Sequence, residues 1–324
     1  MNKYSIGIDL GGTKILTAIV DNTTGEVLCY TKIKTKRNKS EEKIIRKIIK
    51  SIKEVLNEAQ KDISEIDSIG IGAAGQTNRE KGIIINAPNI GIENLNIKEI
   101  LEKEFNKTVF LGNDVEVAAV AEILFGGGKD EKDFICIFVG TGVGSCIVQD
   151  GKIRHGATGN AGEIGHIIIE YNGRKCGCGA NGCLEAYASR LAIEKRIIEE
   201  LNKGMKSDIT NYIKENKPIK TAMLRKALSN NDETTRLILD EASSYLATGI
   251  ASIINFYNPS KIVLGGGLIN GIDYFYERTI ELTKERTLKI ASSGTKFDRA
   301  RLGDFAGAIG AAMIKEYRTN FSWR

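Results

Sequence analysis

One histidine and three cysteines stand close together in the segment HIIIEYNGRKCGCGANGCLE, residues 166–185. His166, Cys176, Cys178 and Cys183 supply an imidazole and three thiolates, a ligand set typical of a tetrahedral zinc site. Four protein ligands leave no position for water, so the predicted Zn²⁺ is structural and holds a loop in one shape. The alternative is a glycine-rich loop with free cysteines.

Two other interpretations of this segment have less support. Gly177, Gly179 and Gly182 match the string G-x-G-x-x-G, but the dinucleotide motif needs a hydrophobic strand directly before it, and here the polar run YNGRK precedes it. A disulfide framework is not expected from six cysteines in 324 residues. The N-terminus also lacks a charged leader followed by an apolar segment. We therefore expect a cytoplasmic protein with reduced thiols.

Three glycine-rich turns indicate a site for a nucleoside triphosphate. Backbone N–H groups reach phosphate oxygens where no Cβ intervenes, and positive φ angles would form an anion-binding nest. The residues predicted to bind ATP and Mg²⁺ are Asp9, Gly11, Gly12, Thr13, Lys14, Thr141, Gly142, Gly265, Gly266 and Gly267. Asp9 ends an apolar run, where its carboxylate could hold Mg²⁺ directly or through water, or could cap the turn.

Asp114 is the candidate general base. It follows the apolar run TVFLGN and precedes the helix-forming run VEVAAVAE. A carboxylate at such a turn can accept the proton of a hydroxyl group that attacks the γ-phosphate. The same position also suits an ordinary helix N-cap, and the two roles are compatible.

Alternating strands and helices must position these residues. Apolar runs separated by turn residues predict a three-stranded meander, and amphipathic or apolar helices then alternate with further strands. The predicted strands are 4–10, 15–20, 26–33, 67–75 and 108–114, and the predicted helices are 40–60, 96–105 and 115–126. This alternation is typical of a mixed sheet covered by helices.

The strand, glycine turn and strand unit recurs. The runs FICIFVG, TGVG and SCIVQDGKI repeat the order of YSIGIDL, GGTK and ILTAIV, with an acidic turn after each copy. Two copies predict duplicated lobes that each offer a turn to a shared cleft. The alternative is two unrelated glycine hairpins.

Charge and hydropathy exclude other classes of protein. The net charge is +5 on 46 basic and 41 acidic residues, a surplus too small to indicate a nucleic-acid ligand. No apolar run reaches the eighteen residues that a membrane helix needs. We expect neither nucleic acid nor a membrane as a partner.

The segments GIDLGGTK, GND, GTGVG, GEIGH and CGCGANGCLE together resemble the ROK family of bacterial sugar kinases and sugar-responsive repressors. The resemblance covers the whole chain and is most specific between Ala161 and Glu185. It implies the α/β actin-like, hexokinase-like ATPase fold, with two lobes of mixed sheets around a deep cleft and a zinc-bound loop. The expected small lobe is 1–115 plus 305–324, and the expected large lobe is 116–304 with the zinc loop at 166–183.

The resemblance also implies roles for individual residues. Asp114 would be the catalytic base. The residues expected to contact the sugar are Asn89, Asn113, Asp114, Glu163, His166 and Glu185. His166 would bind zinc through one ring nitrogen and a sugar hydroxyl through the other. Without that resemblance, Glu163 and Glu185 fit surface carboxylates on a loop and at a helix start equally well.

The function implied is ATP-dependent phosphorylation of a hexose, with glucose as the expected substrate and a homodimer as the expected assembly. Alternatives are a kinase for N-acetylmannosamine, N-acetylglucosamine or fructose, and a sugar-sensing regulator. The first strand begins at about Tyr4, which leaves no room for a preceding helix-turn-helix domain and favours the kinase. Many family members read Asn-Asp-Ala-Asn where this chain has Val115 and Glu116 after Asn113-Asp114, and many carry Gly-Trp where it reads NIGIENL. The second change leaves the hexose open.

Overall fold

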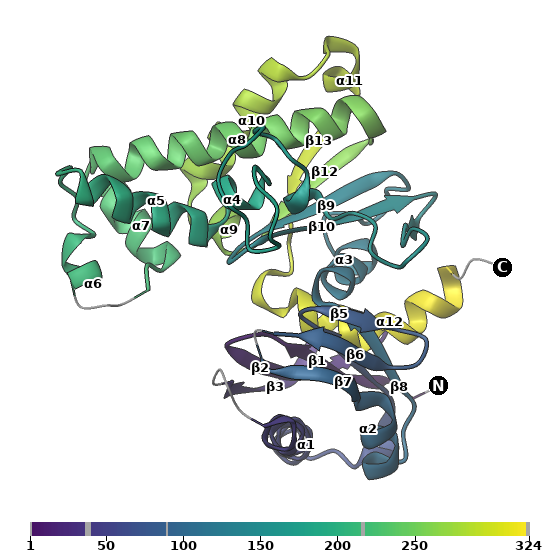
Figure 1. Ribbon diagram of the computed structural model, residues 1–324. Helices are drawn as coiled ribbons and strands as arrows, with labels where there is room; N and C mark the ends of the chain where they lie inside the picture. The colour runs from purple at the N-terminus through teal and green to yellow at the C-terminus, as the bar shows by residue number, and fades with distance from the viewer. Residues whose placement is uncertain (1, 36–39, 89, 215–217, 322–324) are drawn as a thin grey trace. The chain divides into compact units, whose positions relative to one another are not determined.

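The computed structural model describes residues 2–35, 40–88, 90–214 and 218–321 (Figure 1). The chain divides into two compact units. The first unit comprises residues 1–130 and 301–324, and the second comprises residues 131–300.

The first unit is built on a five-stranded mixed sheet in the order β3-β2-β1-β4-β8. Strands β1 (Tyr4–Leu10), β2 (Lys14–Asp21) and β3 (Val27–Lys34) pair antiparallel, which confirms the predicted meander. Strands β4 (Ile66–Ala73) and β8 (Val109–Asn113) continue the sheet parallel to β1. The last residue of β8 is therefore Asn113, directly before the candidate base.

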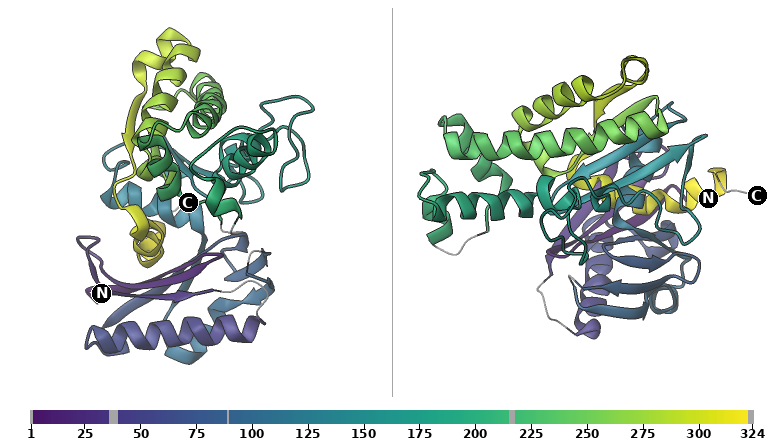
Figure 2. Two further views of the ribbon diagram at one scale, coloured as in Figure 1. Left: turned by 90° about the vertical axis from the view of Figure 1, so that its left-hand side faces the viewer. Right: turned by 45° about the horizontal axis from the view of Figure 1, so that its top comes forward.

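Helices cover both faces of this sheet (Figure 2). Helix α1 (Glu41–Glu58) turns a stripe of buried residues, spaced at helical periodicity, toward the face that carries Ile15 and Ile19 of β2. Helix α12 (Ala306–Phe321) packs on the opposite face, against Leu16, Ala18 and Val20. Alternate residues of β2 thus enter two different cores, as a strand buried on both faces requires.

A second, three-stranded antiparallel sheet belongs to the same unit and was not anticipated from the sequence. It consists of β5 (Gln76–Asn78), β6 (Ile83–Ala87) and β7 (Ile92–Asn96), followed by α2 (Ile97–Phe105). A short 3₁₀ turn, η1 (Ile63–Glu65), precedes β4. The three strands have only three to five residues each, and none of them alternates strictly between apolar and polar residues, the pattern by which strands are predicted.

The second unit repeats the topology of the first. Its sheet has the order β11-β10-β9-β12-β13, in which a hairpin is extended by strands parallel to its first strand. The strands are β9 (Phe134–Val139), β10 (Val143–Gln149), β11 (Lys152–Ile153), β12 (Lys261–Gly265) and β13 (Lys296–Arg299). The order matches that of the first sheet strand for strand, which confirms the predicted duplication.

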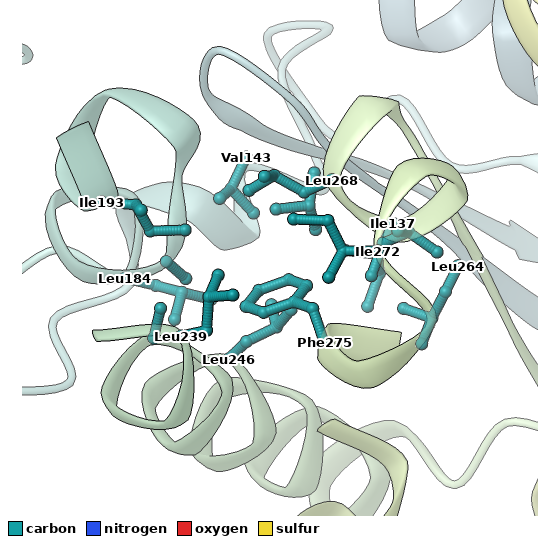
Figure 3. Packing of buried hydrophobic residues seen from close by; sticks show 14 of the residues in the cluster. Ile137, Val143, Leu184, Ile193, Leu239, Leu246, Leu264, Leu268, Ile272 and Phe275 are labelled. Carbon is teal, nitrogen blue, oxygen red and sulfur yellow. The ribbon is translucent and has the colours of Figure 1, made fainter. Parts of the chain in front are cut away.

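A set of helices packs on this second sheet around Phe275, which is fully buried among Leu239, Leu246 and Ile272 (Figure 3). The helices of the unit are α4 (Glu185–Ala188), α5 (Arg190–Asn202), α6 (Thr210–Lys214), α7 (Thr221–Ser229), α8 (Glu233–Tyr257), α9 (Gly267–Gly271), α10 (Asp273–Arg286) and α11 (Lys289–Gly294). Within the described residues, only α8 has the length and apolar composition to cross a membrane, and more than half of that apolar window is buried in the protein.

Helix α3 (Asp114–Phe125) lies in the first unit. The expected boundary after residue 115 assigned most of this helix to the large lobe, whereas the first unit extends to residue 130 and resumes at 301 instead of 305. The backbone of α3 touches α12 closely, because a Cβ added to Gly310 would lie 1.6 Å from the carbonyl oxygen of Val117. A short turn, η3 (Gly303–Phe305), leads into α12. The sequence pattern located α3 but could not show which sheet it packs on.

Glycines allow α12 to approach the first sheet at backbone distance. A Cβ on Gly70 of β4 would lie 1.7 Å from the carbonyl oxygen of Ala311. We expect Gly70→Ala to destabilise the protein by about 3 kcal/mol or more, because the helix must move away from the sheet. Gly294→Ala is the control, since a Cβ there meets no atom within 4 Å. Urea denaturation of both variants checks this, and equal midpoints would contradict the close packing.

Candidate functional site

The turn between β8 and α3 positions the candidate base. Asn113 caps α3, because its Oδ1 accepts the backbone N–H of Val115 at 2.8 Å and its Nδ2 donates to the carbonyl oxygen of Gly75 at 3.0 Å. Asp114 is thus the first residue of the helix and not its N-cap, which corrects the structural alternative drawn from the sequence. Its own Oδ1 lies 3.0 Å from the Val115 nitrogen.

The surroundings of Asp114 stabilise its ionised carboxylate less than water does, which suits a proton acceptor. Burial raises the pKa of the Asp114 carboxyl, while the N–H groups of Val115 and of Asp114 itself and the Asn113 side chain act in the opposite direction. A raised pKa brings the carboxylate closer to the operating pH, which improves a general base. The geometry therefore permits the role that the sequence indicated.

Sequence reasoning overlooked Glu116 at this turn. Its Oε2 accepts the N–H of Asn113 at 3.2 Å, which completes a reciprocal capping box. The signal was present, because Asn113 and Glu116 have the three-residue spacing of that motif before an apolar run.

Asp9 lies at the carboxyl end of β1 in the same unit. Burial raises the pKa of its carboxyl to about 6; Lys14 opposes this shift, and the negative charges of Asp114 and Asp304 add to it. Lys14 also lies 3.8 Å from Asp304. A divalent cation would relieve the repulsion among these acidic groups, so the donor set fits Mg²⁺.

The glycine turns differ from the expectation of positive φ angles. Gly11, Gly12, Gly140 and Gly142, all within the described residues, have no φ in the left-handed region, whereas Gly266 has a φ of 90°. The first two turns close tight hairpins, with Gly11 N–H bonded to the Lys14 carbonyl at 3.0 Å and Gly140 N–H to the Gly142 carbonyl at 2.9 Å. Hairpin hydrogen bonding therefore sets their backbone, and among the glycines predicted to bind ATP only Gly266 has a positive φ.

In the second unit, Glu185 joins the zinc loop to the Gly140–Gly144 turn. Its Oε2 accepts the N–H of Val143 at 2.9 Å, and a Cβ on Gly142 would lie 2.3 Å from the same oxygen. Leu184, directly before Glu185, is fully buried in the core that also contains Val143 (Figure 3). The core thus fixes the carboxylate against the turn.

Glu163 and His166 are held beside the same turn. Glu163 directly precedes the 3₁₀ turn η2 (Ile164–His166), His166 is the last residue of that turn, and both side chains are exposed. Gly165 between them packs on β10, where a Cβ would lie 2.1 Å from the carbonyl oxygen of Val143. Gly165 and Glu185 therefore both adjoin Val143, and Glu163 and His166 lie within two residues of Gly165 in the chain.

The four predicted zinc ligands converge. The ligand atoms of His166, Cys176, Cys178 and Cys183 all lie within 4.8 Å of one another. Nδ1 of His166 is 3.7 Å from Sγ of Cys176, and Sγ of Cys178 is 3.7 Å from Sγ of Cys183. Such spacings suit a tetrahedral zinc with metal–sulfur bonds of about 2.3 Å. Burial raises the pKa of the Cys183 thiol to about 12, so it stays protonated at neutral pH unless a cation takes the place of its proton.

A cavity of about 190 Å³ opens in the second unit next to these residues, lined by Thr141, Glu185 and Cys176 with residues of α5. A larger hollow of about 460 Å³ lies over the solvated side chains of α1 and contains none of the predicted site residues. Of the other predicted residues, Thr13 and Lys14 lie in the first unit and Gly265 and Gly267 in the second. Asn89 lies outside the described residues.

Comparison with known proteins identifies the family. A model of the ROK family matches residues 5–317. The chain belongs to the ROK family. Among curated ROK relatives, the glucokinase of Halalkalibacterium halodurans is 32% identical over 320 residues, covering 98% of this chain and 97% of the relative. The xylose repressor of Caldicellulosiruptor bescii is 29% identical over 310 residues, covering 95% of this chain and 77% of the repressor.

Solved ROK structures support the same assignment. A ROK family glucokinase from Streptomyces griseus, determined in complex with glucose and AMPPNP, aligns with a TM-score of 0.82 and 28% identity over 96% of this chain and 98% of that one. The predicted actin-like, hexokinase-like ATPase fold is thereby confirmed, with the two mixed sheets described above.

The pKa of Asp9 predicts a pH-dependent stability. In the folded protein the pKa of the Asp9 carboxyl is raised from 3.8 to about 6, so folding favours its protonated form. This contribution to stability is fully present below the unfolded-state pKa of 3.8 and is lost as the pH rises through 6. Asp9→Asn should therefore stabilise the protein on the order of 2 kcal/mol at about pH 8, with no gain at about pH 4. Urea midpoints across this range measure it; a gain that does not change with pH would contradict the assignment.

The cysteine cluster predicts bound zinc. Cys183→Ser should lower the metal content from about one zinc per chain to near zero, because a hydroxyl is a poor replacement for a thiolate in this set. Loop 166–183 should also become sensitive to protease. Cys29→Ser is the matched control, since Cys29 lies on β3 away from the cluster. Elemental analysis measures the zinc, and equal content in both variants would exclude the site.

Proposed function

We propose that this ROK family sugar kinase is a glucokinase, which transfers the γ-phosphoryl group of ATP to the 6-hydroxyl of glucose. The observation that carries the proposal is Asp114, a half-buried carboxylate with a raised pKa at the first position of α3. The choice of glucose rests on the glucokinases that match this chain from end to end. Kinases for N-acetylmannosamine, N-acetylglucosamine or fructose are the alternatives.

In the first unit, Asp114 accepts the proton of the attacking hydroxyl. Asn113 orients the turn through the two bonds described, and in this proposal it also binds a sugar hydroxyl. Asn89 is the further sugar contact in the proposal. Binding of this kind places the hydroxyl against the base before transfer, which is where most of the acceleration arises.

In the second unit, Glu163, His166 and Glu185 bind further hydroxyl groups of the sugar. Nδ1 of His166 faces Cys176 at 3.7 Å, so Nε2 is the nitrogen available for the sugar. Zinc on Nδ1 would fix the tautomer with the proton on Nε2, which then donates to a hydroxyl. The zinc loop thus shapes the sugar pocket.

The glycine turns and Asp9 bind the nucleotide in this proposal. Mg²⁺ held near Asp9 would supply positive charge to the phosphate oxygens. Thr13, Lys14 and Thr141 offer side-chain donors, and Gly266 offers backbone that no side chain covers. The proposal includes a homodimer in the cytoplasm and no nucleic-acid ligand.

A sugar-sensing regulator is the second candidate, because the repressor relatives match this chain over 95% of its length. A sensor needs the hydroxyl-binding residues but no general base. The raised pKa of Asp114 favours the kinase, because a carboxylate whose anionic form is weakened by burial is a better proton acceptor.

The test is ADP release by the zinc-loaded protein with MgATP and a panel of hexoses, each compared with a blank that lacks sugar. Release with glucose well above that of the other sugars supports the proposal. Release with another hexose keeps the kinase and changes its substrate. Binding of a sugar without ADP release would establish the sensor instead.

Asp114→Asn tests the base. The amide keeps the shape of the side chain but accepts no proton, so turnover should fall by about 10²–10⁴-fold. Glucose affinity, measured by calorimetry, should change by less than about threefold. Turnover within a few fold of the wild type would show that Asp114 only contributes to the start of α3.

A further inference from the structure

Glu116 is a buried carboxylate at the start of α3, only 7% exposed. Its two oxygens have different partners. Oε2 accepts the N–H of Asn113 at 3.2 Å. Oε1 lies 3.6 Å from Nη2 of Arg318 and 4.0 Å from Nη1 of Arg79.

These partners come from separate parts of the first unit. Arg318 lies on α12 and donates to the carbonyl oxygen of Leu111 in β8 at 2.8 Å. Arg79 lies in the turn between β5 and β6. Glu116 therefore joins the β8–α3 turn to α12 and to the small three-stranded sheet.

The charges of Glu116, Arg318 and Arg79 depend on one another. Burial lowers the pKa of Arg318, Glu116 opposes that shift, and Arg79 adds to it through like-charge repulsion. The Glu116 carboxylate is thus the anion that lets two guanidinium groups share one partly buried site. Removal of one member of a buried ion pair costs much more than loss of a surface pair, because the remaining charge is left unpaired.

We propose that Glu116 is a positioning residue for phosphoryl transfer: its carboxylate holds the Asn113–Asp114 turn and, through Arg79, ties that turn to the β5–β6 turn. This inference rests on the proposed function, because it concerns the placement of Asp114 against the sugar hydroxyl. A shift of about 1 Å at a catalytic group can cost a hundredfold in rate. Glu116 itself touches no substrate in this proposal.

A purely stabilising role would predict a different result, and the chain offers a matched control. Lys315 and Asp67 form an ion pair of 2.6 Å between α12 and β4, with side chains 29% and 14% exposed. This pair anchors the same helix to the same sheet but does not include the β8–α3 turn. Asp67→Asn therefore measures what the loss of such an anchor does to stability alone.

The experiment compares Glu116→Gln with Asp67→Asn. The glutamine keeps an oxygen for the Asn113 N–H and removes the charge. We expect kcat of Glu116→Gln to fall roughly tenfold to a hundredfold, with the dissociation constant for the sugar changed by less than about threefold. Asp67→Asn should keep kcat within about twofold even if its Tm falls. Adding Arg318→Met to Glu116→Gln should lower kcat by less than the product of the two single effects, because the two residues form one ion pair.

Each outcome decides the matter. Wild-type kcat in Glu116→Gln, or an equal fall in Asp67→Asn, would overturn the positioning role. If Glu116→Gln does not fold, Arg79→Met replaces it, because the closer pair with Arg318 stays intact; a kcat at least about threefold lower supports the proposal and an unchanged kcat overturns it. Absence of ADP release by the wild-type protein with every hexose is a separate result, which counts against the proposed function.

Discussion

The start of α3 constrains the rest of the first unit, because backbone N–H groups and the side chains of Asn113, Asp114 and Glu116 must all find hydrogen-bond or ion-pair partners there. A helix begins with unpaired N–H groups, and here Asn113 and Glu116 satisfy them reciprocally. That arrangement leaves Asp114 as the first helical residue, so its carboxylate is held by the helix without capping it. Capping, ion pairing and the candidate chemistry thus share one turn, and a change in one of them affects the others.

In the second unit, the core and the predicted zinc loop hold the candidate site residues. Loop 166–183 is too polar and glycine-rich to fold by burial alone, so it needs an additional constraint. One end is tied by Leu184 in the core and by Glu185 on the N–H of Val143. The cysteines and His166 provide the other constraint when zinc binds. Rigid attachment on both sides is what exposed residues such as Glu163 and His166 need in order to present fixed geometry to a ligand.

How much the sequence could predict follows from what each pattern reports. The five strands of the first mixed sheet and the β9–β10 hairpin of the second were predicted because apolar runs and glycine turns are local signals, and the recurrence of the pattern indicated the duplication. Strand β13, with the sequence KFDR, was not predicted. The clustering of His166 with the three cysteines was also predicted from a local pattern. The unit to which α3 belongs was not predicted, because the residues that a helix packs against are distant in sequence. Glu116 was overlooked although its spacing from Asn113 is a local signal, and its arginine partners Arg79 and Arg318 are distant in sequence. The φ angles of Gly11 and Gly140 depend on hairpin hydrogen bonds, which residue type alone does not specify.

Asp9 and Asp114 show how two carboxylates in one unit can have different functions. Their negative charges repel, and this repulsion adds to burial in raising the pKa of Asp9 to about 6. A divalent cation near Asp9 would replace the repulsion with attraction and would favour the ionised form of both groups. Proton transfer by Asp114 would in this way be linked to nucleotide loading by electrostatics alone, without any change in backbone structure.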